Sequence, residues 1–154
     1  MKTYVTVHAI AINKKGEALV LQRAKHRSSP DKWNCVTGYI QDRESAEEAA
    51  LRELKEETNL VGKIIKTTEP FWVDSGKIRW VVITSLIKIA NESKLKIDEG
   101  ESQAYKWIKT GDPIVKNSVG LKASLEKLGL IPSVKLPQSQ AKSLFAKLRM
   151  NGVV

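Results

Sequence analysis

The sequence predicts an α/β fold in which a mixed β-sheet lies between helices. Three features support this prediction: strand-like apolar segments on both sides of a charged segment, a well-capped helical segment over 46–58, and leucines at helical spacing around residue 125. The 154 residues suit one domain with a proper core. We expect this domain to cover residues 1–130, followed by a C-terminal extension over 131–154.

The chain begins with a pattern that is typical of a β-hairpin. Residues 4–12 alternate aliphatic and smaller side chains, and 18–22 form a second apolar run. The intervening Asn-Lys-Lys-Gly reads as a turn. Arg23, Lys25, His26 and Arg27 follow the second strand. They could contact phosphates or line a solvated loop, and for Lys25 and Arg27 the solvated loop is at least as good an interpretation.

The clearest local signal is a helix over residues 46–58. Ser45 and Glu48 have the spacing of a capping box, in which each side chain satisfies a backbone amide of the other. The segment contains neither Gly nor Pro. Asn59 follows it, and Asn is second to Gly as a helix-ending residue in the left-handed conformation.

Three glutamates share one face of this helix. Glu53, Glu56 and Glu57 have the spacing i, i+3, i+4, while Leu51 and Leu54 point to another side. Adjacent carboxylates repel each other, and a hard cation such as Mg²⁺ would relieve that repulsion. A solvated acidic face is the alternative that charge spacing alone favours.

The spacing of the residues around these glutamates favours a metal site over a solvated acidic face. Gly38 is followed by five residues and Glu44, then by seven residues and Arg-Glu-Leu-x-Glu-Glu from Arg52 to Glu57. This pattern resembles the signature of the Nudix hydrolase family, except that Asn59 stands where the family usually has Gly. Six specified positions match over 23 residues. Asn adopts the same backbone conformation at modest cost.

The resemblance implies an α/β/α sandwich with a loop–helix–loop that binds divalent metal. Glu53, Glu56 and Glu57 would be the metal ligands, joined by the carbonyl of Gly38. Arg52 would orient the glutamates. Family members typically hydrolyse a nucleoside diphosphate linked to another group. The expected cofactor is Mg²⁺, with Mn²⁺ as the alternative.

Two further stretches resemble one subgroup of the family, the dihydroneopterin triphosphate or dATP pyrophosphohydrolases. They are Trp-x-x-Val-Thr-Gly over 33–38 and Glu-x-x-Ala-Tyr-Lys-Trp over 101–107. The resemblance implies that Glu101 is an extra metal ligand or general base; the alternative is an ordinary member of the acidic loop 98–101. It also places Arg23 near substrate, and Tyr39 beside Gly38 is a further candidate substrate contact.

The rest of the chain predicts more strands and a second helix. Strands are expected at 63–68, 71–74, 77–89, 95–97 and 104–108, and a helix carries Leu121, Leu125 and Leu128. Trp72 and Trp80 flank the Ser-Gly turn at 75–76 and could pair across it. Each tryptophan alone suits a core, but we expect at least one of Trp33, Trp72 and Trp80 to line the pocket. An amphipathic helix is expected over 139–150.

Composition narrows the functional class. The net charge is +9, but 20 lysines against 6 arginines are scattered rather than clustered. That favours a small polyphosphate substrate over nucleic acid, which stays an alternative. No apolar run approaches a membrane span, and the N-terminus has no signal-peptide pattern. Cys35 is the single cysteine and reads as core, so a cytoplasmic location is expected. A monomer and a homodimer are both open.

Together these patterns predict Mg²⁺-dependent cleavage of a nucleoside or pterin triphosphate to the monophosphate and pyrophosphate. One alternative is house-cleaning of damaged or RNA-linked nucleotides by the same machinery. The other is a non-catalytic module that binds a nucleotide or RNA.

Overall fold

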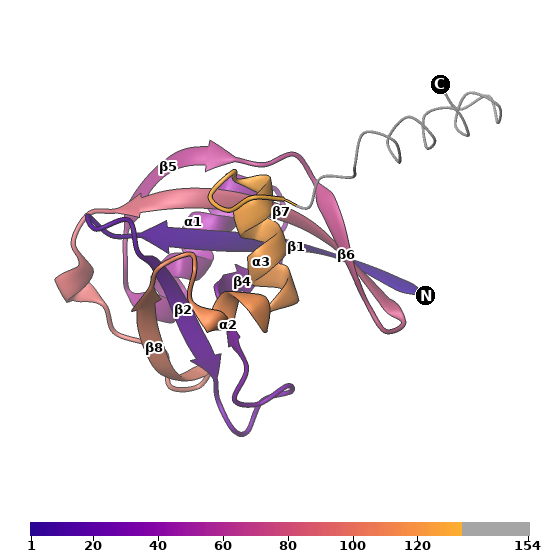
Figure 1. The fold of residues 1–154 in the computed structure, drawn as a ribbon, viewed down its shortest axis with the longest axis horizontal. Helices are drawn as coiled ribbons and strands as arrows, with labels where there is room; N and C mark the ends of the chain where they lie inside the picture. Colours follow the sequence, from indigo (N-terminus) through magenta and orange to yellow (C-terminus); the bar gives the residue numbers. More distant parts are fainter. Residues whose placement is uncertain (134–154) are drawn as a thin grey trace.

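A computed structural model describes residues 1–133 and confirms the α/β class, with a mixed sheet between two helical layers (Figure 1). The strands are β1 (Lys2–Ile12), β2 (Ala18–Arg23), β3 (Trp33–Asn34), β4 (Val36–Gly38), β5 (Gly62–Thr67), β6 (Phe71–Ser75), β7 (Ile78–Ile89) and β8 (Ser102–Ile108). The helices are α1 (Ala46–Thr58), α2 (Pro113–Lys116) and α3 (Val119–Lys127), with a 3₁₀ turn at Glu92–Lys94. The helix expected over 139–150 lies outside the described residues.

Two long parallel strands form the centre of the sheet. β1 and β7 pair in register from Lys2 with Ile78 to Ile12 with Lys88. All other pairings are antiparallel: β2 and β4 flank β1, β5 and β6 pair with opposite ends of β7, and β3 and β8 pair with β2. The sheet is therefore mixed, as the sequence predicted.

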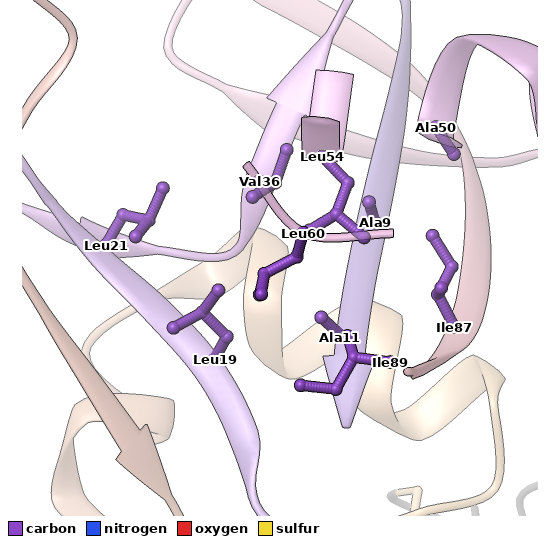
Figure 2. Packing of buried hydrophobic residues seen from close by; sticks show 10 residues of the cluster. All are labelled: Ala9, Ala11, Leu19, Leu21, Val36, Ala50, Leu54, Leu60, Ile87 and Ile89. Atoms are coloured by element: carbon purple, nitrogen blue, oxygen red, sulfur yellow. The ribbon is translucent and has the colours of Figure 1, made fainter. Parts of the chain in front are cut away.

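Alternation along β1 divides the core between the two layers. Ala9 and Ala11 pack with Ala50 and Leu54 of α1 in a fully apolar cluster (Figure 2). The intervening Ile10 belongs to a second cluster that includes leucines of α3. Because successive side chains of a strand point to opposite faces, one strand anchors both helical layers. Cys35 is buried in the second cluster, as expected.

Most predicted elements are confirmed to within two residues, and α1 has the predicted bounds. The strand predicted at 95–97 is wrong. This segment pairs with no strand, because amides within it and next to it bond to the end of α1: Lys96 N–H donates to Thr58 O and Asp98 N–H to Glu57 O, both at 2.9 Å. Pro113 begins α2, since its fixed φ suits the first helical position.

The proposed pairing of Trp72 with Trp80 is also wrong. In the β6–β7 hairpin Trp72 lies opposite Val81, one residue away from Trp80, so the two rings lie on opposite faces. Trp80 instead stacks on Tyr4, with ring centroids 5.3 Å apart. None of the helices within residues 1–133 is both long enough and apolar enough to cross a bilayer.

Candidate active site

The position of α1 is set by hydrogen bonds at both of its ends. Glu48 N–H donates to the Ser45 hydroxyl at 3.1 Å, and Ser45 N–H donates to the Glu48 carboxylate at 3.4 Å. Asn59 ends the helix with φ +62°, and its side-chain amide donates to Lys94 O at 3.0 Å. Because both ends are held, the glutamates of α1 have defined positions relative to the loops around them.

Arg52 connects the loop before α1 to two of the candidate ligands. Its Nε and Nη2 donate to both carboxylate oxygens of Glu44 at 2.7 and 3.0 Å, and Nη2 also donates to Tyr39 O at 2.9 Å. Its Nη1 donates to Glu53 at 3.0 Å and to Glu56 at 3.2 Å. This guanidinium orients the glutamates and holds the loop, and its bond to Glu44 lowers the pKa of that carboxyl.

Gly38 permits the closest approach in the site. A Cβ atom on Gly38 would lie 2.1 Å from the Glu53 carboxyl carbon, so any larger residue would displace that carboxylate. The Gly38 carbonyl accepts a hydrogen bond from the Thr6 hydroxyl at 2.8 Å. Thr6 has no signal in the sequence, because it approaches Gly38 only through the pairing of β4 with β1.

Glu57 is the most unusual residue of the site. Its Oε2 is buried and has no hydrogen-bond partner in the described structure. Burial raises the pKa of Glu57 to about 8, helped by the charges of Glu53, Glu101 and Asp98 and opposed by that of Arg23. A buried acceptor without a donor is costly in a native protein and calls for a functional explanation.

Glu101 joins the glutamates of α1 from a distant part of the chain. Its charge raises the pKa of both Glu53 and Glu57, although burial is the larger cause for each. Its carboxylate lies 3.1 Å from Arg27 Nη2. The structure thus brings Glu53, Glu57 and Glu101 towards one another, whereas the Glu56 side chain is 56% exposed and faces Arg52.

These residues fit a divalent cation. The donor set is carboxylate oxygen, which Mg²⁺ prefers, and the buried Glu57 Oε2 offers an unused acceptor. Within residues 1–133 no three acidic, imidazole or thiol groups converge as a complete ligand set, and Arg52 engages both Glu53 and Glu56. Glu53, Glu57 and Glu101, with Glu56 next to them, are therefore candidate ligands for such an ion and not a preformed ligand set.

The candidate substrate contacts lie in different environments. Arg23 is near enough to lower the pKa of Glu57, and its guanidinium donates to Ser28 O at 2.5 Å. Trp33 is half-buried and packs against the second core cluster, which includes the leucines of α3. Lys106 Nζ lies 4.9 Å from its ring centroid. Tyr39 is 57% exposed, while the Trp80 ring stacks on that of Tyr4. Among these four side chains, the charge of Arg23 is the one that affects a glutamate, Glu57.

The sequence matches the family model of the NUDIX domain over residues 2–125. Nudix hydrolase 5 of Arabidopsis thaliana is 26% identical over 143 residues, covering 90% of this chain and 46% of that protein. Nudix hydrolase 19, chloroplastic, of the same plant is 27% identical over 100 residues, covering 64% of this chain and 23% of that protein. The chain therefore spans less than half the length of these relatives.

Solved structures share the fold. A MutT NUDIX hydrolase from Burkholderia pseudomallei has a TM-score of 0.68 at 18% identity, covering 83% of this chain and 99% of that one. The Escherichia coli dihydroneopterin triphosphate pyrophosphohydrolase has a TM-score of 0.60 at 25% identity, covering 79% of this chain and 92% of that one.

Proposed function

This chain belongs to the Nudix family, and on that premise we propose that it is a Mg²⁺-dependent pyrophosphohydrolase. Its substrate would be a nucleoside triphosphate or a pterin triphosphate, and its products the monophosphate and pyrophosphate. The observation that carries the proposal is the buried, unpartnered carboxylate oxygen of Glu57 beside Glu53 and Glu101. The name of the E. coli structural neighbour supports the pterin alternative.

The residues of this chain would act in distinct ways. Glu53, Glu57 and Glu101 would hold the cation, which when bound would supply Lewis-acid polarisation of the phosphate oxygens. Arg52 keeps Glu53 and Glu56 in place. Arg23 stabilises negative charge on the phosphates.

Hydrolysis requires one water molecule and one proton acceptor. The water oxygen forms a bond to phosphorus as the anhydride P–O bond breaks, and pyrophosphate leaves with that bridging oxygen. Glu56, Glu57 and Glu101 are the three candidates to accept the proton of the water. Three glutamates contact Arg52, and the side chain of Glu56 is the most exposed to solvent among them.

The test is a substrate panel assayed with Mg²⁺ for separate release of phosphate and pyrophosphate. The panel contains the nucleoside triphosphates, dATP, 8-oxo-dGTP, dihydroneopterin triphosphate, ADP-ribose and 5′-triphosphorylated RNA. Hydrolysis in H₂¹⁸O then identifies the attacked phosphorus, since label in the monophosphate means attack at the α-phosphate.

The matched pair of variants is Glu56→Gln and Glu47→Gln, both on exposed positions of α1. We expect Glu56→Gln to lower kcat by about 100-fold or more, and Glu47→Gln to keep activity. Pyrophosphate release that survives in Glu56→Gln would contradict the assignment of this residue. Binding without turnover across the panel would contradict an enzymatic function and favour the alternative, a non-catalytic binding module.

A further inference from the structure

Two loops at the same end of the paired strands β2 and β8 contact each other. The first, residues 24–31, connects β2 to β3, and the second, residues 98–101, leads into β8. Ala24 N–H donates to Glu101 O at 3.0 Å, and the His26 ring is hydrogen-bonded to Gly100 O at 3.0 Å. The acidic loop therefore has backbone as well as side-chain contacts with the basic loop.

The same acidic loop is fastened to α1 on its other side. Asp98 N–H donates to Glu57 O at 2.9 Å, and Glu101 N–H and Ser102 N–H both donate to Asp98 O. The backbone of Glu101 is therefore fixed between α1 and the basic loop. These backbone bonds do not determine the direction of the Glu101 side chain.

We propose that Arg27 is a positioning residue that sets this direction, through its contact of 3.1 Å with the Glu101 carboxylate. The inference rests on the proposed function, because it assigns Arg27 to the cation site of that function. Arg27 holds Glu101 at the edge of the Glu53–Glu57 pair and does not itself contact substrate.

Electrostatics give the reason for such a residue. Glu101 is a third carboxyl group beside Glu53 and Glu57, and whenever these neighbours are ionised their charge would turn its side chain towards solvent. Arg27 offsets this repulsion from outside the cluster. The Arg27 side chain is 42% exposed and that of Glu101 31%, so solvent screens this pair less than a fully exposed pair.

Lys25 provides the contrast within the same loop. Its side chain is 78% exposed, and its Nζ lies 3.7 Å from an oxygen of Asp31, which is itself 54% exposed. A pair of this kind contributes little. Lys25→Ala therefore removes one positive charge from the loop without touching Glu101, and it is the matched control.

The experiment is a double-mutant cycle of Arg27→Ala and Glu101→Gln, with kcat, substrate KM and the Mg²⁺ concentration for half-maximal rate measured for each protein. We expect Arg27→Ala to lower kcat by about 10- to 100-fold and to raise the Mg²⁺ requirement. It should have no further effect in the Glu101→Gln background. Arg27→Lys should restore part of the loss, and Lys25→Ala should behave as wild type.

A second readout does not depend on catalysis. Mn²⁺ binding to the substrate-free proteins, followed by electron paramagnetic resonance, should weaken in Arg27→Ala and not in Lys25→Ala. An inactive wild type that binds Mn²⁺ in this pattern would overturn the proposed function and support the role of Arg27.

Three results would overturn the role of Arg27. One is additivity of the two substitutions in the cycle. Another is a rise in substrate KM with an unchanged Mg²⁺ requirement, which would indicate direct contact with phosphate. The third is unchanged Mn²⁺ binding in Arg27→Ala. Arg27→Lys and Arg27→Gln, with thermal unfolding recorded for all variants, keep the test decisive if the alanine variant folds poorly.

Discussion

At the residue scale, Glu57 is where stability and function conflict. Burial without a hydrogen-bond donor disfavours its charged form and raises its pKa to about 8. A cation would reverse that balance by favouring the charged form. The metal-free protein thus carries a cost that ion binding at Glu57 would remove, which is the pattern expected of a functional carboxylate rather than a solvated one.

The first prediction concerns Glu57→Gln in the metal-free protein. The ordinary pKa of 4.5 applies to the unfolded chain and about 8 to the folded chain. As pH rises through this window, the unfolded chain loses the proton first, so the free energy of unfolding falls. Gln is neutral at every pH. Glu57→Gln should therefore raise the free energy of unfolding at pH 8.5, by on the order of a few kcal/mol, and change it little at pH 4.

Urea unfolding in the presence of a chelator measures this difference, and the activity assay measures kcat on the same samples. We expect a more stable protein at pH 8.5 that has lost at least about 100-fold in kcat. Equal stability differences at the two pH values would show that packing, and not ionisation, controls the effect.

At the element scale, α1 supports the site because its ends are connected to different loops. Its N-terminus is capped by Ser45, and Arg52 fastens the loop before it through Glu44. At its C-terminus, Asn59 has the backbone conformation that Gly usually supplies, and its side chain also holds Lys94 O. The departure from the family pattern thus adds a bond to the segment that leads to Glu101.

The second prediction tests this bond with Asn59→Gly. Gly is favoured in the left-handed conformation, which offsets the lost hydrogen bond, so global stability should change by less than about 1 kcal/mol. The segment 94–101 should open more often. Hydrogen exchange of the Lys96 and Asp98 amides, which donate to the end of α1, should therefore accelerate relative to wild type.

The matched control is Ser45→Ala at the other end of α1. It should cost about 1 kcal/mol in global stability and leave exchange in 94–101 unchanged under conditions where the protein stays folded. Unchanged exchange in Asn59→Gly would mean that the backbone bonds to Thr58 and Glu57 suffice to hold the segment.

At the scale of the whole molecule, a buried polar chain joins the central strands to the helical layer opposite α1. His8 Nδ1 is hydrogen-bonded to the Ser124 hydroxyl at 2.8 Å, and that hydroxyl to the Thr84 hydroxyl at 2.9 Å. Gly120 brings α3 close, since a Cβ there would lie 3.1 Å from the His8 ring. Burial lowers the pKa of His8 to about 4.

The third prediction follows from that lowered pKa. Above the ordinary value of 6.5, His8 is neutral in both the folded and the unfolded chain. As pH falls from 6.5 towards 4, only the unfolded chain takes up the proton, so stability is lost. At pH 5 this amounts to about 2 kcal/mol relative to pH 7.

His8→Gln should remove this share of the pH dependence, whatever its effect on stability at pH 7. Chemical unfolding at pH 7 and pH 5 measures the change for each protein. His26→Gln, which removes the other histidine from an exposed loop, is the matched control. A wild-type pH dependence in His8→Gln would show that His8 does not resist protonation in the folded protein.

Much of the fold could be predicted because its signals are local. Capping at Ser45 and the αL residue Asn59 define α1, and alternation defines β1 and β7. The segment 95–97 could not be predicted, because its amides bond to α1 rather than to a strand. The relative placement of Trp72 and Trp80 could not be predicted either, since the register of the hairpin decides which face of the sheet each side chain occupies.

The sequence by itself determined the identity and spacing of Glu53, Glu56 and Glu57, and the helix that carries them, because a single turn of helix sets those relations. Only the tertiary structure decided which carboxyl groups influence one another. It buried Glu57, turned Glu56 towards Arg52, and brought Glu101 and Arg27 to the same place. The physical reason is that burial and charge proximity arise from contacts between segments far apart in the chain, which no local pattern records.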